Sequence, residues 1–148
     1  MIVIENLPSH VPAESLAGKE RDTLVATWEQ RRWVRRRATT ARGREVALAL
    51  PTGTVLGPGA VLFVGPEWYL EVEPAPEPLL AVHPRDRREA LQTAFEVGNR
   101  HFSLALDGER LLVPDDIAME QLLTRLGVRW ERTRAVFSPI GAGHRHEH

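Results

Sequence analysis

Short apolar segments, each bounded by glycine or proline, fill the first half of the chain. Four of them, at residues 23–28, 46–50, 60–64 and 68–73, are rich in β-branched, aromatic or continuously apolar residues and predict β-strands. Glycine and proline at residues 51–53, 57–59 and 65–66 supply the turns between them. Because no sustained helical spacing occurs before residue 74, we predict an all-β amino-terminal domain over residues 1–74.

A proline run at residues 74–78 interrupts this pattern with three prolines in five residues. Proline fixes its own φ and restricts the residue before it, so such a run is stiff and disfavoured inside a sheet. We therefore predict that residues 74–78 form a linker.

The hydrophobic period changes after the proline run. Residues 79–82 predict a short strand, and residues 84–101 predict a helix in which Leu91, Ala94, Phe95 and Gly98 recur at helical spacing. Residues 103–106 and 110–113 predict a hairpin around the turn dipeptide Asp107-Gly108.

A second helix is predicted from a cap at Asp115 or Asp116 to a stop at Gly127, followed by a strand over residues 128–137. Its shared apolar face consists of Met119, Leu122, Leu123 and Leu126. The resulting order βαββαβ is the ferredoxin-like plan, expected over residues 75–140. The predicted fold class is therefore α+β, with residues 141–148 forming a flexible histidine-bearing tail because they are too polar and glycine-rich to pack.

Composition narrows the function classes. The 148 residues are 43% hydrophobic and 26% charged, which suits a chain that builds a core. A net charge of -1 gives no global attraction to nucleic acid or to an acidic membrane. The chain has no apolar segment of about 20 residues and no basic, apolar leader at its start, so we expect a cytoplasmic protein without membrane insertion.

Histidine is the candidate metal ligand, because the chain contains no cysteine. One candidate is His101, which closes the segment Gly98-Asn99-Arg100-His101, and the others are His144, His146 and His148 in the tail. Imidazole suits Ni²⁺, Cu²⁺ and Zn²⁺ better than Ca²⁺ or Mg²⁺. From spacing alone, His101 also fits a cationic residue that complements a helix carboxyl end.

Residues 96–102, with their Gly-Asn-Arg-His core, resemble the signature of the urease accessory protein UreE family. The order of residues 22–31, 43–51 and 53–56 is similar to the amino-terminal domain of that family, and residues 111–114 and the histidine-bearing end also fit. The resemblance extends from about residue 20 to the carboxyl terminus.

This resemblance implies a homodimeric nickel metallochaperone that delivers Ni²⁺ to the urease maturation complex, which includes the GTPase UreG. It implies that His101 is the central metal ligand, and a two-fold axis can bring the residue together from both chains. Zn²⁺ or Cu²⁺ is expected to bind the same ligands. We also predict a partner- or peptide-binding role for the amino-terminal domain, and a supporting role for Gly98, Asn99 and Arg100 at the helix end.

Other histidines are weaker candidates. The tail is either a metal-binding tract or a solvated terminus without a role. Some family members carry a histidine pair after the hairpin, where this chain has Asp115 and Asp116, so a secondary site there is doubtful. His10 and His83 are interpreted as loop residues, with His83 a weak candidate for an auxiliary ligand.

The basic cluster at residues 31–37 contains five arginines and Trp33. It fits a strand with one solvated face, a docking surface for an acidic partner, or a nucleic-acid site. A catalytic role finds little support, because the chain has no cysteine nucleophile, Gly-x-Ser-x-Gly elbow, Walker loop or His-Glu-x-x-His helix. We therefore predict a non-enzyme, with a metal-dependent hydrolase and an arginine-mediated nucleic-acid-binding module as the alternatives.

Overall fold

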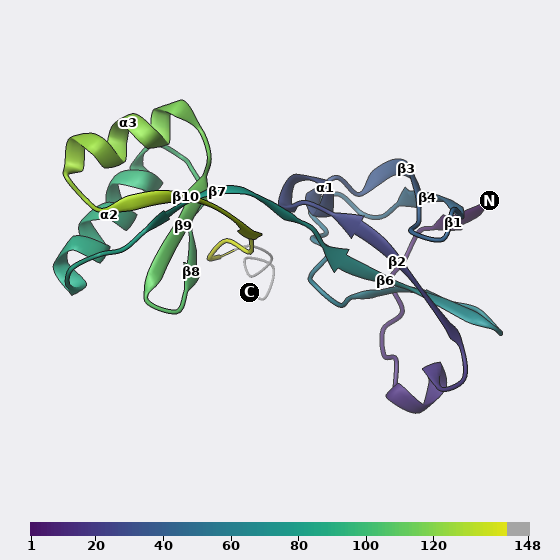
Figure 1. Ribbon diagram of the computed structural model, residues 1–148. Coiled ribbons are helices and arrows are strands. Elements are labelled where there is room, and N and C mark those ends of the chain that lie inside the picture. The colour runs from purple at the N-terminus through teal and green to yellow at the C-terminus, as the bar shows by residue number, and fades with distance from the viewer. Residues whose placement is uncertain (142–148) are drawn as a thin grey trace. The chain divides into compact units, whose positions relative to one another are not determined.

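The computed structural model describes residues 1–141, so the predicted tail ligands His144, His146 and His148 lie outside the described residues. The chain divides into two compact units, residues 1–75 and the part from residue 76 onward (Figure 1). Each unit has its own buried cluster of hydrophobic side chains.

The amino-terminal unit contains two three-stranded sheets. The first has the order β1-β4-β3, with β1 (Ile2–Ile4) parallel to β4 (Glu45–Ala49) and β3 (Arg35–Thr39) antiparallel to it. The second has the order β2-β6-β5, with β2 (Glu20–Ala26) parallel to β6 (Trp68–Pro74) and β5 (Val61–Val64) antiparallel to it. Both sheets contribute to one core, which includes Leu24, Val46, Leu48, Leu62, Leu70 and Val72.

The prediction of an all-β amino-terminal half was too simple. Residues Trp28–Arg32 form a short helix, α1, and Ala13–Leu16 form a 3₁₀ turn, η1. Trp28, predicted as the end of a strand, is the first residue of α1. The reason is a capping box, in which the Thr27 side chain accepts from Gln30 N–H while the Gln30 side chain accepts from Thr27 N–H. Local capping thus overrides the β propensity of the segment, and the unit is β-rich.

Asp22 organises the loops at one end of this unit from a buried position. Its carboxylate accepts hydrogen bonds from the Thr40 hydroxyl, the Arg44 guanidinium and the backbone N–H of Arg42 and Thr23. Burial alone pushes the pKa of Asp22 upward, but these hydrogen bonds outweigh it and lower the pKa below its ordinary value.

The proline run joins the two units, whose boundary falls between Ala75 and Pro76, but it lies within strands, which corrects the prediction that it stands outside a sheet. Pro74 ends β6, while Pro76 and Pro78 belong to β7 (Pro76–Val82). Residues 76–78 pair with one neighbouring strand, β10 (Trp130–Val136), and pairing with the other neighbour begins at Leu79. Prolines are tolerated there because their missing N–H groups can face the unpaired side.

The carboxyl-terminal unit has the predicted βαββαβ order. After β7 come α2 (Arg87–Asn99), β8 (Ala105–Asp107), β9 (Arg110–Pro114), α3 (Ile117–Leu126) and β10, in an antiparallel sheet of order β10-β7-β9-β8. The predicted hairpin is present, but its turn falls at Gly108-Glu109, one residue after the expected Asp107-Gly108, because Asp107 pairs with Arg110. The two helices lie on the same side of the sheet (Figure 1) and share a core with it, which includes Leu80, Val82, Val97, Leu111, Val113, Met119, Leu122 and Leu123.

The second helix confirms its sequence signals more fully than the first. Asp116 caps α3 by accepting from Ala118 N–H, the predicted apolar face is buried or packed against the core, and Gly127 follows the last turn. In contrast, α2 is shorter than the predicted 84–101, and its buried residues are Thr93 and Val97. None of the helices within residues 1–141 has the length and apolar character needed to span a membrane.

Candidate metal centre

His101 lies just beyond the end of α2, in a left-handed backbone conformation with φ of 62°. Two hydrogen bonds close the helix end around it: His101 N–H donates to Gly98 C=O at 2.9 Å, and Phe102 N–H donates to Val97 C=O at 3.2 Å. These are the two bonds of a Schellman motif, and His101 occupies the position where glycine is usual. Phe102 packs against the core cluster that contains Val97, which completes the motif with its hydrophobic contact.

The backbone at His101 stores strain. Among residues 1–141, His101 is the only residue other than glycine that has a positive φ. A side chain in this conformation costs about 1–2 kcal/mol relative to the right-handed region, and somewhat less for residues such as histidine that visit it more often. Such outliers are typical of positions where the side chain has a function.

The imidazole of His101 is exposed and forms no hydrogen bond or ion pair with any described residue. The neighbouring Arg100 is held differently, because its Nη1 donates to Glu96 Oε1 at 2.7 Å and to Glu96 C=O at 3.0 Å. Arg100 is thus tied back to its own helix, while His101 is free to bind a ligand. Gly98 and Asn99 lie in the last turn and at the end of α2.

Of the four predicted metal ligands, one lies in the described part of the chain. His101 is placed, the tail histidines are outside residues 1–141, and within those residues no three histidine, aspartate or glutamate side chains gather as a metal cluster. A single exposed imidazole cannot hold an ion tightly, so any site built on His101 needs ligands from elsewhere.

The other two described histidines, His10 and His83, are distant from His101 in the sequence and contact other residues. His83 Nε2 lies 2.6 Å from Glu131 Oε2, and His83 N–H donates to Arg129 C=O. The His83–Glu131 pair was not predictable from spacing, because 48 residues separate its members. His10 lines a hollow together with Leu7, Leu62 and Phe63 in the other unit.

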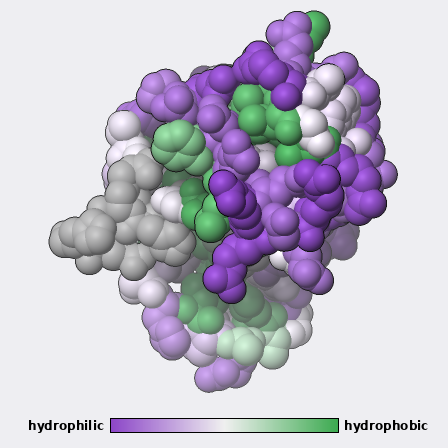
Figure 2. All heavy atoms as spheres, turned by 90° about the vertical axis from the view of Figure 1, so that its left-hand side faces the viewer, coloured by the Kyte–Doolittle hydropathy of each residue, from purple (hydrophilic) through white to green (hydrophobic). Residues whose placement is uncertain are grey.

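An apolar stripe on α2 leads towards His101. It consists of Leu91, Ala94, Phe95 and Gly98, the residues whose spacing predicted the helix. Leu91 is 64% exposed and Phe95 is 68% exposed, so the stripe faces away from the core of its own chain. Figure 2, viewed from the side of α2 and α3, shows apolar residues at the surface among hydrophilic ones. The sequence indicated the stripe but not its exposure, because Ala90, Thr93 and Val97 form a competing face that is packed instead.

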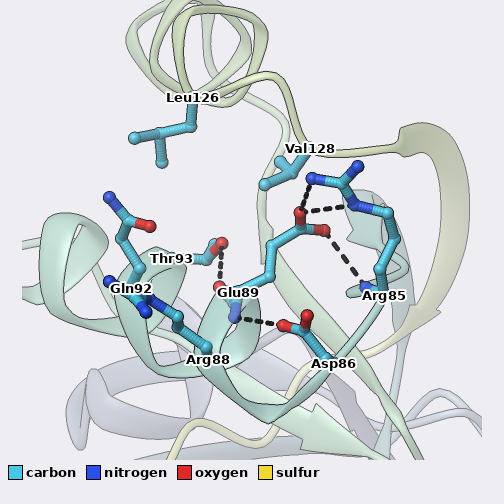
Figure 3. A pocket seen from close by; sticks show the side chains of 8 residues that line it. All are labelled: Arg85, Asp86, Arg88, Glu89, Gln92, Thr93, Leu126 and Val128. Atoms are coloured by element: carbon cyan, nitrogen blue, oxygen red, sulfur yellow. Dashed lines mark hydrogen bonds and ion pairs between the residues drawn. The ribbon is translucent and has the colours of Figure 1, made fainter.

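A pocket of about 180 Å³ lies at the opposite end of α2 (Figure 3). Three of its charged side chains interact with their own helix end: Arg85 Nη2 lies 2.7 Å from Glu89 Oε2, and Asp86 caps the helix by accepting from Glu89 N–H. The hydrogen bond and ion pair with Glu89 raise the pKa of Arg85. The pocket has no histidine in its lining, so it is not part of the candidate metal centre.

Comparison with known proteins supports the sequence resemblance over nearly the whole chain. Residues 3–75 match the UreE urease accessory protein N-terminal domain, and residues 77–148 match the C-terminal domain of the same family.

Individual relatives agree with this match. The chain is 36% identical to the urease accessory protein UreE of Ralstonia nicotianae over 97% of its own length and 72% of that protein. It is 40% identical to the protein of the same name from Synechococcus, with 83% of each chain covered. It is also 40% identical to the one from Deinococcus radiodurans, over 85% of this chain and 81% of that protein. The chain therefore belongs to the UreE family of urease accessory proteins.

Proposed function

We propose that the protein is a nickel-binding metallochaperone that delivers Ni²⁺ during assembly of the urease active site. The observation that carries this proposal is the exposed, unpartnered imidazole of His101, held in a left-handed conformation that favours glycine. An imidazole is a good ligand for Ni²⁺, and also for Cu²⁺ and Zn²⁺, which are expected to compete. The names of the relatives support a role in urease maturation.

A homodimer supplies the missing ligand. In a two-fold interface the same surface of each chain faces its copy, so a residue near the axis meets its counterpart. The exposed apolar stripe of α2 supports such an interface, because Phe95 precedes His101 by six positions and large exposed apolar side chains favour association. We infer that two copies pack over this stripe and bring two His101 imidazoles to one ion.

The tail histidines His144, His146 and His148 are proposed as additional ligands. Alternating imidazoles on a short segment can close over one ion, and four or more nitrogen ligands hold Ni²⁺ better than two. A cytoplasmic location and transfer to a partner complex that includes the GTPase UreG complete the proposal.

The proposed role is binding and transfer rather than catalysis. A metal-dependent hydrolase and an arginine-mediated nucleic-acid-binding module are the competing functions. Turnover of a substrate by the nickel-loaded protein would favour the first, and salt-sensitive oligonucleotide binding would favour the second.

A calorimetric nickel titration with molar mass measured in parallel tests the proposal. We expect the tightest site to hold one ion per two chains. His101→Ala should weaken nickel binding by more than about 100-fold, because removing a metal ligand lowers the affinity more than removing a residue that only supports a ligand. His83→Ala is the matched control, since it removes a histidine from the same unit, and we expect it to leave the site unchanged. Full-strength binding by His101→Ala would contradict the proposal.

The pH dependence identifies the ligand type. Because imidazole must be neutral to bind metal and ordinarily titrates near ~6.5, we expect nickel affinity to fall steeply between about pH 7 and 5. The fold should persist over that range. The pKa of Asp22 is lowered, so its stabilising contribution is complete above the unfolded value of ~3.9 and is lost only below it. Circular dichroism during the titration separates metal release from unfolding, and a flat affinity would mean that the ligands are wrongly assigned.

A further inference from the structure

The basic cluster at residues 31–37 forms a distinct surface on the amino-terminal unit. Arg32 ends α1, Trp33 follows it and is 59% exposed, and β3 begins at Arg35. We define the arginine edge as Arg32, Trp33, Arg35, Arg36 and Arg37. Along β3 the exposed residues alternate, so Arg35 and Arg37 lie on one face while Arg36 lies on the other and is partly buried.

The arginine edge carries positive charge without neutralising carboxylates. No ion pair joins Arg32, Arg35, Arg36 or Arg37 to an acidic side chain among residues 1–141. Arg32 and Arg35 contact a ring and a backbone oxygen: Arg35 Nη1 donates to Leu50 C=O at 3.2 Å, and the Arg32 guanidinium lies 5.2 Å from the centre of the Trp28 ring. Elsewhere in the described chain many arginines are paired with Asp or Glu, namely Arg21, Arg42, Arg44, Arg85, Arg100, Arg110 and Arg132.

Arg36 holds the exposed indole of Trp33 in place. Its Nε donates to Trp33 C=O at 3.2 Å, and its guanidinium lies 5.6 Å from the centre of the Trp33 ring. The Arg36 Nη2 atom is shielded from solvent and has no hydrogen-bond partner, and burial lowers the pKa of this guanidinium. A negative charge brought nearby would offset the cost of this desolvation.

The backbone of β3 is also available on one side. In the sheet of order β1-β4-β3, β3 is the last strand and pairs with β4 from Arg35↔Ala49 to Thr39↔Glu45. Within residues 1–141 no strand pairs with its other side, which lies along one margin of the amino-terminal unit (Figure 1). An edge strand of this kind can accept a further strand.

We propose that the arginine edge is a docking site for an extended acidic segment of a partner protein, which adds to β3 as a further strand. Residues two apart on a strand are separated by about 6.8 Å, so acidic side chains at alternate positions of the segment would face Arg35 and Arg37. Trp33 supplies an aromatic anchor at the end of the edge.

Charge on an edge strand also prevents self-association, and the same arginines serve both purposes. Two copies of β3 would repel each other, whereas an acidic strand would be attracted. A nucleic acid is a poorer match, because the chain has a net charge of -1 and the arginine edge presents one exposed aromatic ring rather than a series of stacking platforms.

The test is fluorescence anisotropy of the full chain with a fluorescein-labelled heptapeptide in which glutamate alternates with threonine. We expect saturable binding at ~0.1 M salt that weakens as salt rises. Arg35→Gln with Arg37→Gln should weaken it by about tenfold, and Trp33→Ala should weaken it as well. The control Arg125→Gln with Arg129→Gln removes the same charge from exposed arginines of the other unit and should change the affinity by less than about twofold.

Three further results bear on the proposal. A peptide of the same composition with its glutamates contiguous should bind more weakly, because one face of a strand then carries fewer of them. Equal binding of the two peptides, equal loss in the two double variants, or no binding up to about 1 mM would overturn the proposal. Tighter binding of a single-stranded oligonucleotide would overturn it in favour of a nucleic-acid surface. Nickel is absent from the assay, so the outcome is independent of the proposed metal site.

Discussion

The two helices of the carboxyl-terminal unit end with the same hydrogen bonds but with different residues. At the end of α3, Gly127 N–H donates to Thr124 C=O and Val128 N–H donates to Leu123 C=O, and Gly127 has φ of 72°. At the end of α2 the equivalent bonds surround His101, with φ of 62°.

The two helix ends differ in backbone strain. Glycine meets the conformational demand at α3 without strain, whereas histidine meets the same demand at α2 with strain. Nothing in the fold of residues 1–141 uses the imidazole, because it has no polar partner there. The comparison therefore supports the proposal that His101 serves as a metal ligand rather than as part of the fold.

The largest expected effect comes from making the end of α2 like the end of α3. His101→Gly should raise the free energy of unfolding by about 0.5–1 kcal/mol, because it removes the strain at a position suited to glycine. It should also weaken the tight nickel site by more than about 100-fold, because the proposed ligand is lost. Chemical denaturation and nickel calorimetry on one sample measure both effects. A variant that is less stable and still binds nickel would break the comparison.

A smaller effect is expected from the reverse change at α3. Gly127→His should lower the free energy of unfolding by about 1 kcal/mol, since it introduces the strain that α2 already carries. Nickel binding at the tight site should be unchanged, because the new imidazole has no second copy opposite it. Gly127→Ala is the control for backbone strain without an imidazole, and it should destabilise the chain to a similar extent. Unchanged stability in both variants would show that left-handed geometry imposes no strain at this helix end.

The smallest effect concerns Gly98, one residue before the end of α2. A Cβ at this position would meet no atom within 4 Å in the described chain, so Gly98→Ala should stabilise the helix by about 0.5 kcal/mol. If two copies approach over the apolar stripe, the added methyl group should weaken the dimer severalfold. Chemical denaturation measures the change in stability, and analytical ultracentrifugation measures the change in dimer affinity. An unchanged dimer would move the proposed interface away from Gly98.

Sequence patterns predicted the elements of the carboxyl-terminal unit well, because local signals and tertiary packing agree there. In α3 each local signal has the role that the sequence predicts: Asp116 caps the start, the apolar face is buried or packed against the core, and Gly127 ends the helix. The apolar stripe of α2 was harder to interpret. Periodicity shows that Leu91 and Phe95 share a face, but it does not say which of two apolar faces meets the sheet.

Predictions failed in the amino-terminal unit and at the start of the carboxyl-terminal unit. The capping box at Thr27 and Gln30 begins a helix within a β-rich segment of the amino-terminal unit. At the start of β7, Pro76 and Pro78 are tolerated because residues 76–78 pair with a strand on one side only. At the candidate site, the sequence placed His101 at a helix end. Its left-handed backbone was not predictable, because it depends on the two bonds that close the helix.

The most direct test of the metal assignment is nuclear magnetic resonance of the histidine side chains during nickel addition. With ¹⁵N-labelled histidine, the His101 resonances should broaden first and disappear by about half an equivalent of nickel per chain, because a paramagnetic ion shared by two copies lies next to each imidazole. The resonances of His83 should persist at that point. Persistence of the His101 resonances while those of other histidines disappear would contradict the account.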